Sequence, residues 1–128
     1  MKKILVLCIV TLSILFSSCK DKTITTDYTI GCISYYAYAP ESNWTGFQDY
    51  MKSVVDYNIV VHFTNTTIAE NDAQAIAYFD DQLSKIDYTQ ACSFIKDPDK
   101  LVYGIARFDE IGNAYTLKSV TFTESGIR

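Results

Sequence analysis

The sequence predicts an α+β domain in which two helices cover one face of a small, mixed, four-stranded sheet. Two segments repeat apolar residues at the spacing of an amphipathic helix. Four other segments are rich in β-branched and aromatic residues, which favour strands. Turn-forming residues such as Asp97-Pro98-Asp99 lie between them. Together these observations indicate a single α+β domain over residues 28–128.

The first three predicted elements are a strand, a helix and a strand. Residues 28–39, YTIGCISYYAYA, predict a strand that Pro40 ends. Residues 58–63, NIVVHF, predict the second strand. Between them lies a helix capped by Asn43 or Thr45, whose apolar residues recur at helical spacing in Trp44, Phe47, Met51, Val54 and Val55. Since a single helix connects the two strands, we expect a right-handed crossover to a parallel partner.

A second helix is predicted from Thr67 and Glu70, whose spacing is that of a capping box. A helix that begins at Thr67 would place Asp72 inside the apolar stripe, where an ionised carboxylate is costly. We therefore favour a start at Asn71, which makes Asp72 a first-turn acid stabilised by the helix dipole. The alternative is that Asp72 is a buried or pocket carboxylate. The stripe consists of Ile68, Ile76, Phe79, Leu83 and Ile86.

The last two predicted strands, residues 101–108 and 114–123, form an antiparallel hairpin. Leu117 falls on the opposite parity from Phe122, which predicts a bulge or twist near Ser119. The element order is β-α-β-α-β-β. The expected arrangement is therefore a ferredoxin-like sandwich in the loose sense.

The first 22 residues, MKKILVLCIVTLSILFSSCKDK, have a pattern of their own. Two lysines precede the apolar run 4–16, and a helix of that length reaches only about 20 Å, whereas a bilayer core needs roughly 30 Å. Ser17 and Ser18 then precede Cys19. This pattern resembles the signal of a bacterial lipoprotein, with a relaxed lipobox of the kind common in Bacteroidota.

The resemblance implies that residues 1–18 are a signal peptide and that Cys19 becomes the acylated first residue of the mature protein. Residues 19–27 then form the lipidated cysteine and a tether, and lipid on Cys19 holds the domain at the membrane. The resemblance also implies a cell-envelope location, in the outer membrane, at either its periplasmic or its external face.

Charge and motif content argue against several classes of function. The chain carries a formal net charge of −4 and has no Lys/Arg cluster, which argues against nucleic acid as a partner. It has no Gly-rich phosphate loop and no nucleophile elbow, so we expect no catalytic residues and no cofactor. Asp80 and Asp81 are adjacent on the second predicted helix and point about 100° apart, which suits a solvated face better than a catalytic pair.

The cysteines and the histidine could also carry chemistry. Once Cys8 is assigned to the signal and Cys19 to the lipid, Cys32 and Cys92 remain, and they could form a disulfide or stay free in the core. His62 is the single histidine. It could complete a metal site with the two cysteines, but the ligand spacing of such sites is absent. We therefore expect a plain sheet histidine and no bound metal.

Tyrosine is the unusual component of the chain, with ten residues, several of them next to an aspartate. Because tyrosine favours interfaces, the candidate binding residues are Tyr35, Tyr36, Tyr38 and Tyr78. We expect a non-enzymatic, lipid-anchored module that binds a protein partner, as an accessory subunit or an immunity factor. The alternative is a small-ligand or glycan binder in which the tyrosines of the first strand form a stacking platform.

Overall fold

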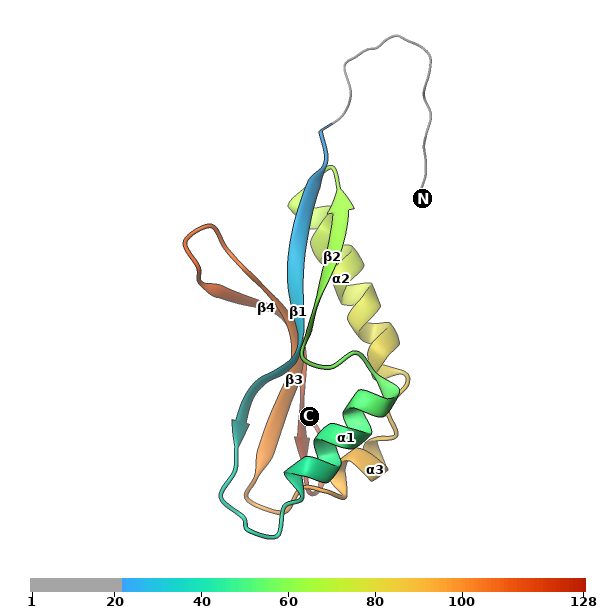
Figure 1. Cartoon of the computed structure of the whole chain (residues 1–128), viewed down its shortest axis with the longest axis vertical. Helices are drawn as coiled ribbons and strands as arrows, with labels where there is room; N and C mark the ends of the chain where they lie inside the picture. Colours follow the sequence, from blue (N-terminus) through green and yellow to red (C-terminus); the bar gives the residue numbers. More distant parts are fainter. Residues whose placement is uncertain (1–21) are drawn as a thin grey trace.

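The computed structural model describes residues 22–128, which form five strands and three helices (Figure 1). The strands are β1 (Ile24–Tyr36), β2 (Ile59–Asn65), β3 (Lys100–Phe108), β4 (Ala114–Thr123) and β5 (Gly126–Ile127). The helices are α1 (Trp44–Val54), α2 (Ile68–Leu83) and α3 (Tyr88–Cys92). The strands make one sheet in the order β2-β1-β3-β4-β5, and each adjacent pair is antiparallel.

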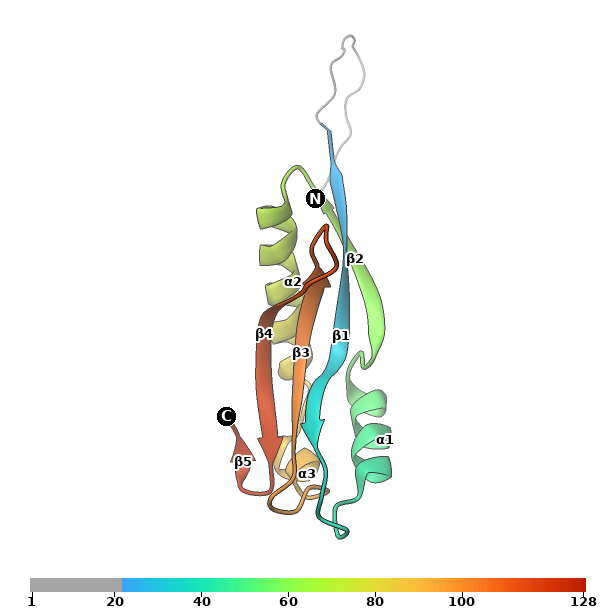
Figure 2. The same ribbon diagram turned by 90° about the vertical axis from the view of Figure 1, so that its left-hand side faces the viewer.

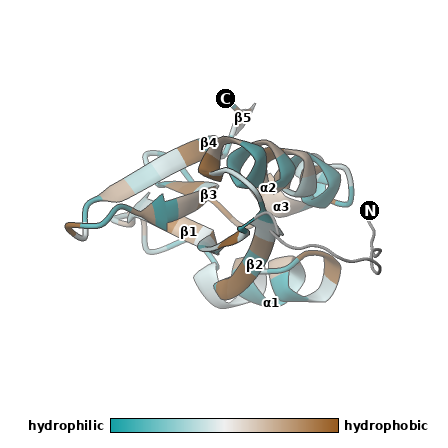
Figure 3. Ribbon diagram, turned by 90° about the horizontal axis from the view of Figure 1, so that it is seen from above, coloured by the Kyte–Doolittle hydropathy of each residue, from teal (hydrophilic) through white to brown (hydrophobic). Residues whose placement is uncertain are grey.

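The helices lie on one side of the sheet, and the opposite face is open (Figures 1 and 3). Tyr103 and Phe122 point from the sheet into the core beneath the helices, where both are fully buried. Phe79 of α2 packs on Tyr103 at 5.2 Å between ring centroids, and Phe47 of α1 packs on Phe122 at 5.5 Å. The predicted α+β class is confirmed, but the sheet has five strands instead of the predicted four. The short helix α3 and the two-residue strand β5 were not predicted.

The predicted parallel pair is wrong, because β1 and β2 are antiparallel. The reason is length. β1 has 13 residues and extends about 40 Å, whereas the 11 residues of α1 advance only about 16 Å. One helix of this size cannot carry the chain back to the start of β1. Instead, α1 returns along the second half of β1 and β2 returns along the first half (Figure 2), so the sheet is antiparallel rather than mixed.

β1 begins at Ile24 and therefore includes residues 24–27, which the sequence placed in the tether. These residues pair with β2 from Ile24, opposite Asn65, onward. Asn71 of α2 is fully buried and explains the extension, because its amide donates hydrogen bonds to the Ile24 carbonyl and to Thr26 Oγ1, both at 2.8 Å. A side chain from the helix layer thus holds the start of β1 in the sheet.

Helix α2 begins at Ile68, with the predicted capping box in place at Thr67 and Glu70. The favoured start at Asn71 is wrong. Asp72 consequently lies inside the helix, on the face turned to the sheet, with its side chain 20 % exposed. The capping box decides the start because it satisfies two backbone N–H groups at the first turn, and the cost of placing Asp72 on the inner face is offset by other side chains.

Those side chains come from two strands of the sheet. Arg107 of β3 donates to both carboxylate oxygens of Asp72, at 2.9 and 3.0 Å, and the Tyr28 hydroxyl of β1 donates to Oδ1 at 2.7 Å. The Arg107 guanidinium also lies 4.5 Å from the ring centroid of Tyr115 on β4. Although burial raises the pKa of Asp72, the hydrogen bonds from Arg107 and Tyr28 lower it below its ordinary value. The carboxylate is therefore ionised and ties α2 to the sheet.

Two smaller predictions are confirmed. The β3–β4 register shifts between Ile105, opposite Lys118, and Ala106, opposite Thr116. Leu117 is the extra residue, close to the predicted bulge near Ser119.

Asp80 and Asp81 form the expected solvated face of α2. The Asp80 carboxylate accepts from Lys118 at 2.6 Å, and Asp81 lies 3.6 Å from Lys85 one turn along the helix. All four side chains are between 43 % and 66 % exposed, so these ion pairs contribute little to stability.

Asp72→Asn is expected to lower the free energy of unfolding at pH 7 by about 2 kcal/mol, because it removes the charge that Arg107 and Tyr28 bind. The pKa of Asp72 in the folded chain lies below its ordinary 3.8, so this contribution is present at neutral pH and disappears as the pH falls through the lowered pKa. Urea unfolding at pH 7 and pH 3 should show the variant and the parent protein converging in acid.

The matched control is Asp81→Asn, which alters an exposed pair on the same helix and should change stability by less than about 0.5 kcal/mol. Equal losses from the two variants at pH 7 would contradict the anchoring role of Asp72.

Candidate functional site

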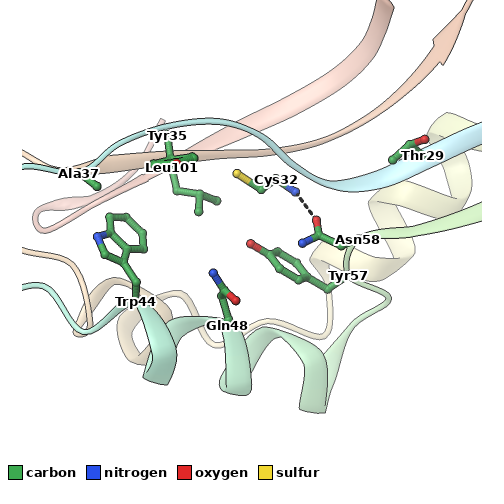
Figure 4. A pocket seen from close by; sticks show the side chains of 9 residues that line it. All are labelled: Thr29, Cys32, Tyr35, Ala37, Trp44, Gln48, Tyr57, Asn58 and Leu101. Carbon is green, nitrogen blue, oxygen red and sulfur yellow. Dashed lines mark hydrogen bonds between the residues drawn. The ribbon is translucent and has the colours of Figure 1, made fainter.

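A pocket of about 680 Å³ lies between the second half of β1 and helix α1 (Figure 4). We call it the β1–α1 pocket. Its walls combine aromatic, aliphatic and uncharged polar side chains, and none of the lining residues carries a formal charge. The lining residues are Thr29, Cys32, Tyr35, Ala37, Trp44, Gln48, Tyr57, Asn58 and Leu101.

The pocket exists because β2 does not follow β1 along its whole length. The β1–β2 ladder ends at the pair Ile30 and Ile59. Immediately before β2, Asn58 has a left-handed backbone (φ 56°), and its side-chain oxygen accepts a hydrogen bond from the Cys32 N–H at 2.9 Å. The Asn58 side chain thus accepts the hydrogen bond that a further residue of β2 would otherwise accept from Cys32. Beyond this point no strand lies next to β1 on this side within the described residues, and the pocket occupies the space.

Gly31 makes this junction sterically possible. A Cβ at this position would lie 2.0 Å from Asn58 Oδ1 and 2.6 Å from the Asn58 nitrogen. The φ of Gly31, 154°, also lies where side-chain-bearing residues are strained. Gly31 therefore allows Asn58 to reach Cys32 and end the β1–β2 ladder at this point.

The opposite wall of the pocket is the first turn and a half of α1. Asn43 caps this helix, since its side chain accepts from the Gly46 N–H at 2.9 Å. Trp44 and Gln48 are four residues apart and share the face toward β1, whereas Phe47 is fully buried on the core face. Figure 4 shows the indole ring and the Gln48 amide bordering the open space.

Tyr57 supplies the central polar group of the pocket. It is only 5 % exposed, and its ring stacks on Tyr103 with the centroids 6.0 Å apart. Its hydroxyl points into the pocket (Figure 4) and has no hydrogen-bond partner among residues 22–128. Burial raises the pKa of this phenol, so the hydroxyl stays protonated and is available as a donor. Leaving such a group unpaired costs about 1–3 kcal/mol, which a ligand acceptor atom would offset.

The disulfide considered between Cys32 and Cys92 is not formed, and both cysteines are free. Cys32 lies at the β1–α1 pocket, whereas Cys92 is buried on α3 beside a different pocket of about 400 Å³. Burial raises the pKa of both thiols, so both are neutral near pH 7 and are weak nucleophiles. Cys32 contributes a small polar surface to the pocket, and its thiol contacts the Ser34 carbonyl at 3.6 Å.

The three candidate tyrosines of β1 do not form one platform. Tyr35 lines the β1–α1 pocket and is 70 % exposed. Tyr36 is the next residue of the strand, so its side chain points to the opposite face of the sheet. It contacts Tyr38 instead, with ring centroids 4.4 Å apart. Successive side chains of a β-strand point to opposite faces, so the three tyrosines do not share one surface. Of the three, only Tyr35 lines the pocket.

Tyr78, the fourth candidate, is not available for binding. It is half-buried on α2, where its ring packs edge-on against Phe63 at 5.7 Å and its hydroxyl donates to Asp56. Its side chain is partly covered because β2 and the loop before it pass over this face of the helix.

His62 is a sheet histidine, as expected. Its Nδ1 lies 2.6 Å from Asp27 on the neighbouring strand β1, and both side chains are more than 60 % exposed. Within residues 22–128, no cluster of three histidine, cysteine or acidic side chains is placed to hold a metal ion.

Six residues of the pocket were not singled out as functional by sequence reasoning, namely Thr29, Ala37, Trp44, Gln48, Asn58 and Leu101. Each has an ordinary local explanation, such as an apolar helix face or a strand. Tyr57 belonged only to the general group of tyrosines next to an aspartate. The one available signal was the spacing of Trp44 and Gln48, which puts a large aromatic and an amide on a single helix face.

Tyr57→Phe is expected to leave the free energy of unfolding unchanged or to raise it by up to about 1 kcal/mol, because it deletes a buried hydroxyl without a partner in the described chain. Tyr103→Phe is the matched control. Its hydroxyl donates to the Asp56 carbonyl at 2.9 Å, so its loss should cost about 1 kcal/mol. Urea unfolding of the two variants makes the comparison. Equal destabilisation by both would mean that the Tyr57 hydroxyl is not free to bind a ligand.

The predicted lipidation site, Cys19, lies outside the described residues. Within residues 22–128, no helix has both the length and the apolar character needed to cross a bilayer. Comparisons of the chain with protein-family models, with curated proteins and with solved structures found no match.

Proposed function

We propose that this chain is a lipid-anchored cell-envelope protein whose domain binds a protein partner at the β1–α1 pocket, without catalysing a reaction. The observation that carries the proposal is the composition of this pocket. It joins apolar walls to a buried hydroxyl that lacks a partner in the described chain, which is the usual composition of a binding pocket.

The same lining supports binding over catalysis. None of the residues that line the pocket is an aspartate, glutamate, histidine or lysine, so the lining has no group that commonly transfers protons near neutral pH. The Cys32 thiol has a raised pKa and no histidine at the pocket to activate it. These side chains can hold a ligand through contacts and hydrogen bonds.

The lipid anchor is proposed on the sequence pattern that ends at Cys19. The fold sets how far the pocket lies from this anchor. Only residues 20–23 lie between Cys19 and the first residue of β1, a span of at most about 17 Å. The pocket extends from Thr29 toward Ala37, roughly 15–40 Å further along the chain. The anchor would thus hold the first half of β1 near the outer membrane and present the pocket away from it.

A small ligand or glycan remains the second candidate, and one observation favours it. Trp44 presents its indole ring to the pocket (Figure 4), and Tyr35 also lines it. Aromatic rings are surfaces on which sugars stack. If the ligand is a protein partner, Gln48 contacts a polypeptide in the cell, and if it is a glycan, Gln48 contacts a carbohydrate.

Cys19→Ala is expected to abolish incorporation of fatty acid into the protein, since the thiol is the proposed acylation site. Cells fed an alkyne-tagged palmitate would be lysed, and the tag on the purified protein would be measured. The control is Cys8→Ala, which changes a cysteine inside the predicted signal and should leave labelling intact. Labelling that persists in Cys19→Ala would contradict the anchor.

A photo-crosslinking residue, p-benzoylphenylalanine, at Gln48 is expected to capture a protein in intact cells, because this exposed side chain borders the pocket. The control places the same residue at Gln90, which is exposed on α3 and does not line the pocket. Adducts should form at position 48 and be several-fold weaker at position 90.

Mass spectrometry of the adduct separates the candidates. A protein adduct specific to position 48 supports the proposed function, whereas a carbohydrate adduct supports the second candidate. Equal adducts at both positions, or none at either, would contradict a partner site at this pocket.

A further inference from the structure

We infer that the β1–α1 pocket and the neighbouring edge of β1 form one groove, and that this groove binds an extended peptide as an additional strand. The inference rests on the proposed function and adds the recognition mode and the chemical class of the ligand. The partner would contribute a peptide in strand conformation, with one uncharged side chain directed into the pocket.

The first observation is an open strand edge. β3 pairs with β1 as far as Tyr36, but the β1–β2 ladder ends at Ile30. From Cys32 to Tyr36, β1 therefore has no neighbouring strand on its β2 side within residues 22–128. In an antiparallel sheet, alternate residues direct their N–H and C=O groups to opposite neighbours. Part of the β1 backbone thus faces this open side, and the Asn58 side chain occupies only the position at Cys32.

The second observation is that the open edge carries no charge or proline that would block pairing. Natural strand edges are usually blocked by charges, prolines, bulges or covering segments. Residues 32–36 of β1 are CISYY, and Tyr35 and Tyr36 are 70 % and 44 % exposed. The register of β1 with β3 shifts between Cys32 and Ser34, and from Ser34 to Tyr36 the pairing is regular. The helix alongside, α1, is separated from this edge by the pocket itself (Figure 4).

The third observation is the direction of the pocket. Three of its lining residues, Thr29, Cys32 and Tyr35, follow one another along β1, and Ala37 comes directly after the strand. Together they cover about 25 Å of extended chain. A pocket that extends along a strand edge fits an extended chain better than it fits a compact ligand, and strand addition to an exposed edge is an established mode of peptide recognition.

The side-chain chemistry follows from the lining. Because the pocket contains no formal charge, burying a charged ligand side chain there would be unfavourable. The Tyr57 hydroxyl is a donor without a partner in the described residues, so the favoured side chain carries an acceptor oxygen. An amide or hydroxyl side chain flanked by apolar residues meets both conditions, with the apolar part against Trp44 and Leu101.

The edge of β2 is the competing location, since β2 is an outer strand of the sheet and exposes Ile59 and Val60. The pocket beside β1 distinguishes the two edges, because the residues from Ile59 to Asn65 do not contribute to it. Hydrogen exchange can report which edge a peptide covers.

The test uses the full-length lipidated protein in detergent micelles and a phage-displayed library of random linear dodecapeptides. Peptides that bind the parent protein and not Gln48→Lys, which puts a charge at the pocket, would be synthesised and their affinities measured. N-methylation at every second peptide position should weaken binding about tenfold where the N–H pairs with β1, and leave it nearly unchanged at the positions between.

Two further measurements accompany it. Tyr57→Phe should weaken the same peptides about tenfold, and peptide binding should slow amide exchange in residues 33–36 but not in residues 59–65. The inference is overturned if no library peptide depends on Gln48, if N-methylation shows no alternation, or if β2 is protected instead.

These outcomes are separate from the test of the proposed function. A protein adduct at Gln48 in cells without alternating N-methyl effects would mean that the partner uses a folded surface, so the proposed function would hold and strand addition would fail. Absence of the adduct as well would overturn both.

Discussion

The length of β1 is the constraint on which the rest of the fold depends. A strand of 13 residues cannot be matched by one short returning element, so α1 and β2 share the return, one along each half of the strand. This division has three consequences. The sheet is antiparallel, the β1–β2 ladder ends at Ile30, and a space remains between β1 and α1. Gly31 and Asn58 lie at the boundary between the half of β1 that pairs with β2 and the half that lies beside α1. The two residues are so close that a side chain at position 31 would collide with Asn58.

The helix layer is held to the sheet by a few polar contacts in addition to the aromatic core. Asn71 bonds to the start of β1 and to Asn65 of β2, and Asp72 bonds to Tyr28 and Arg107, so adjacent residues of α2 reach three strands. An apolar side chain at either position could pack against the sheet but could not specify the register with the same directionality. This explains why the inner face of α2 carries polar residues at these two positions.

Local signals in the sequence predicted the local features of the fold well. The capping box of Thr67 and Glu70, the amphipathic helices and the irregularity near Ser119 depend on residues that are neighbours in the chain. The environment of Asp72 could not be predicted in this way, because its partner Arg107 lies 35 residues away.

Strand direction was also beyond local signals, since the pattern of residues 58–63 is the same for a parallel and an antiparallel partner. The candidate site was harder still. Tyr57, Gln48 and Cys32 come from a loop, a helix and a strand, and only the shared return along β1 brings them together. The tyrosines of β1 looked like a group because they are close in sequence, but the pleat sends neighbours to opposite faces.

The position of β1 has a mechanical consequence. One strand connects the proposed anchor, just before Ile24, to the proposed partner site at its other end. A pull on the bound partner would travel along β1 and load its ladders with β2 and β3 in shear, so that many hydrogen bonds resist together instead of opening one after another. The second strand in the order of the sheet would then carry the tension between the membrane and the bound partner.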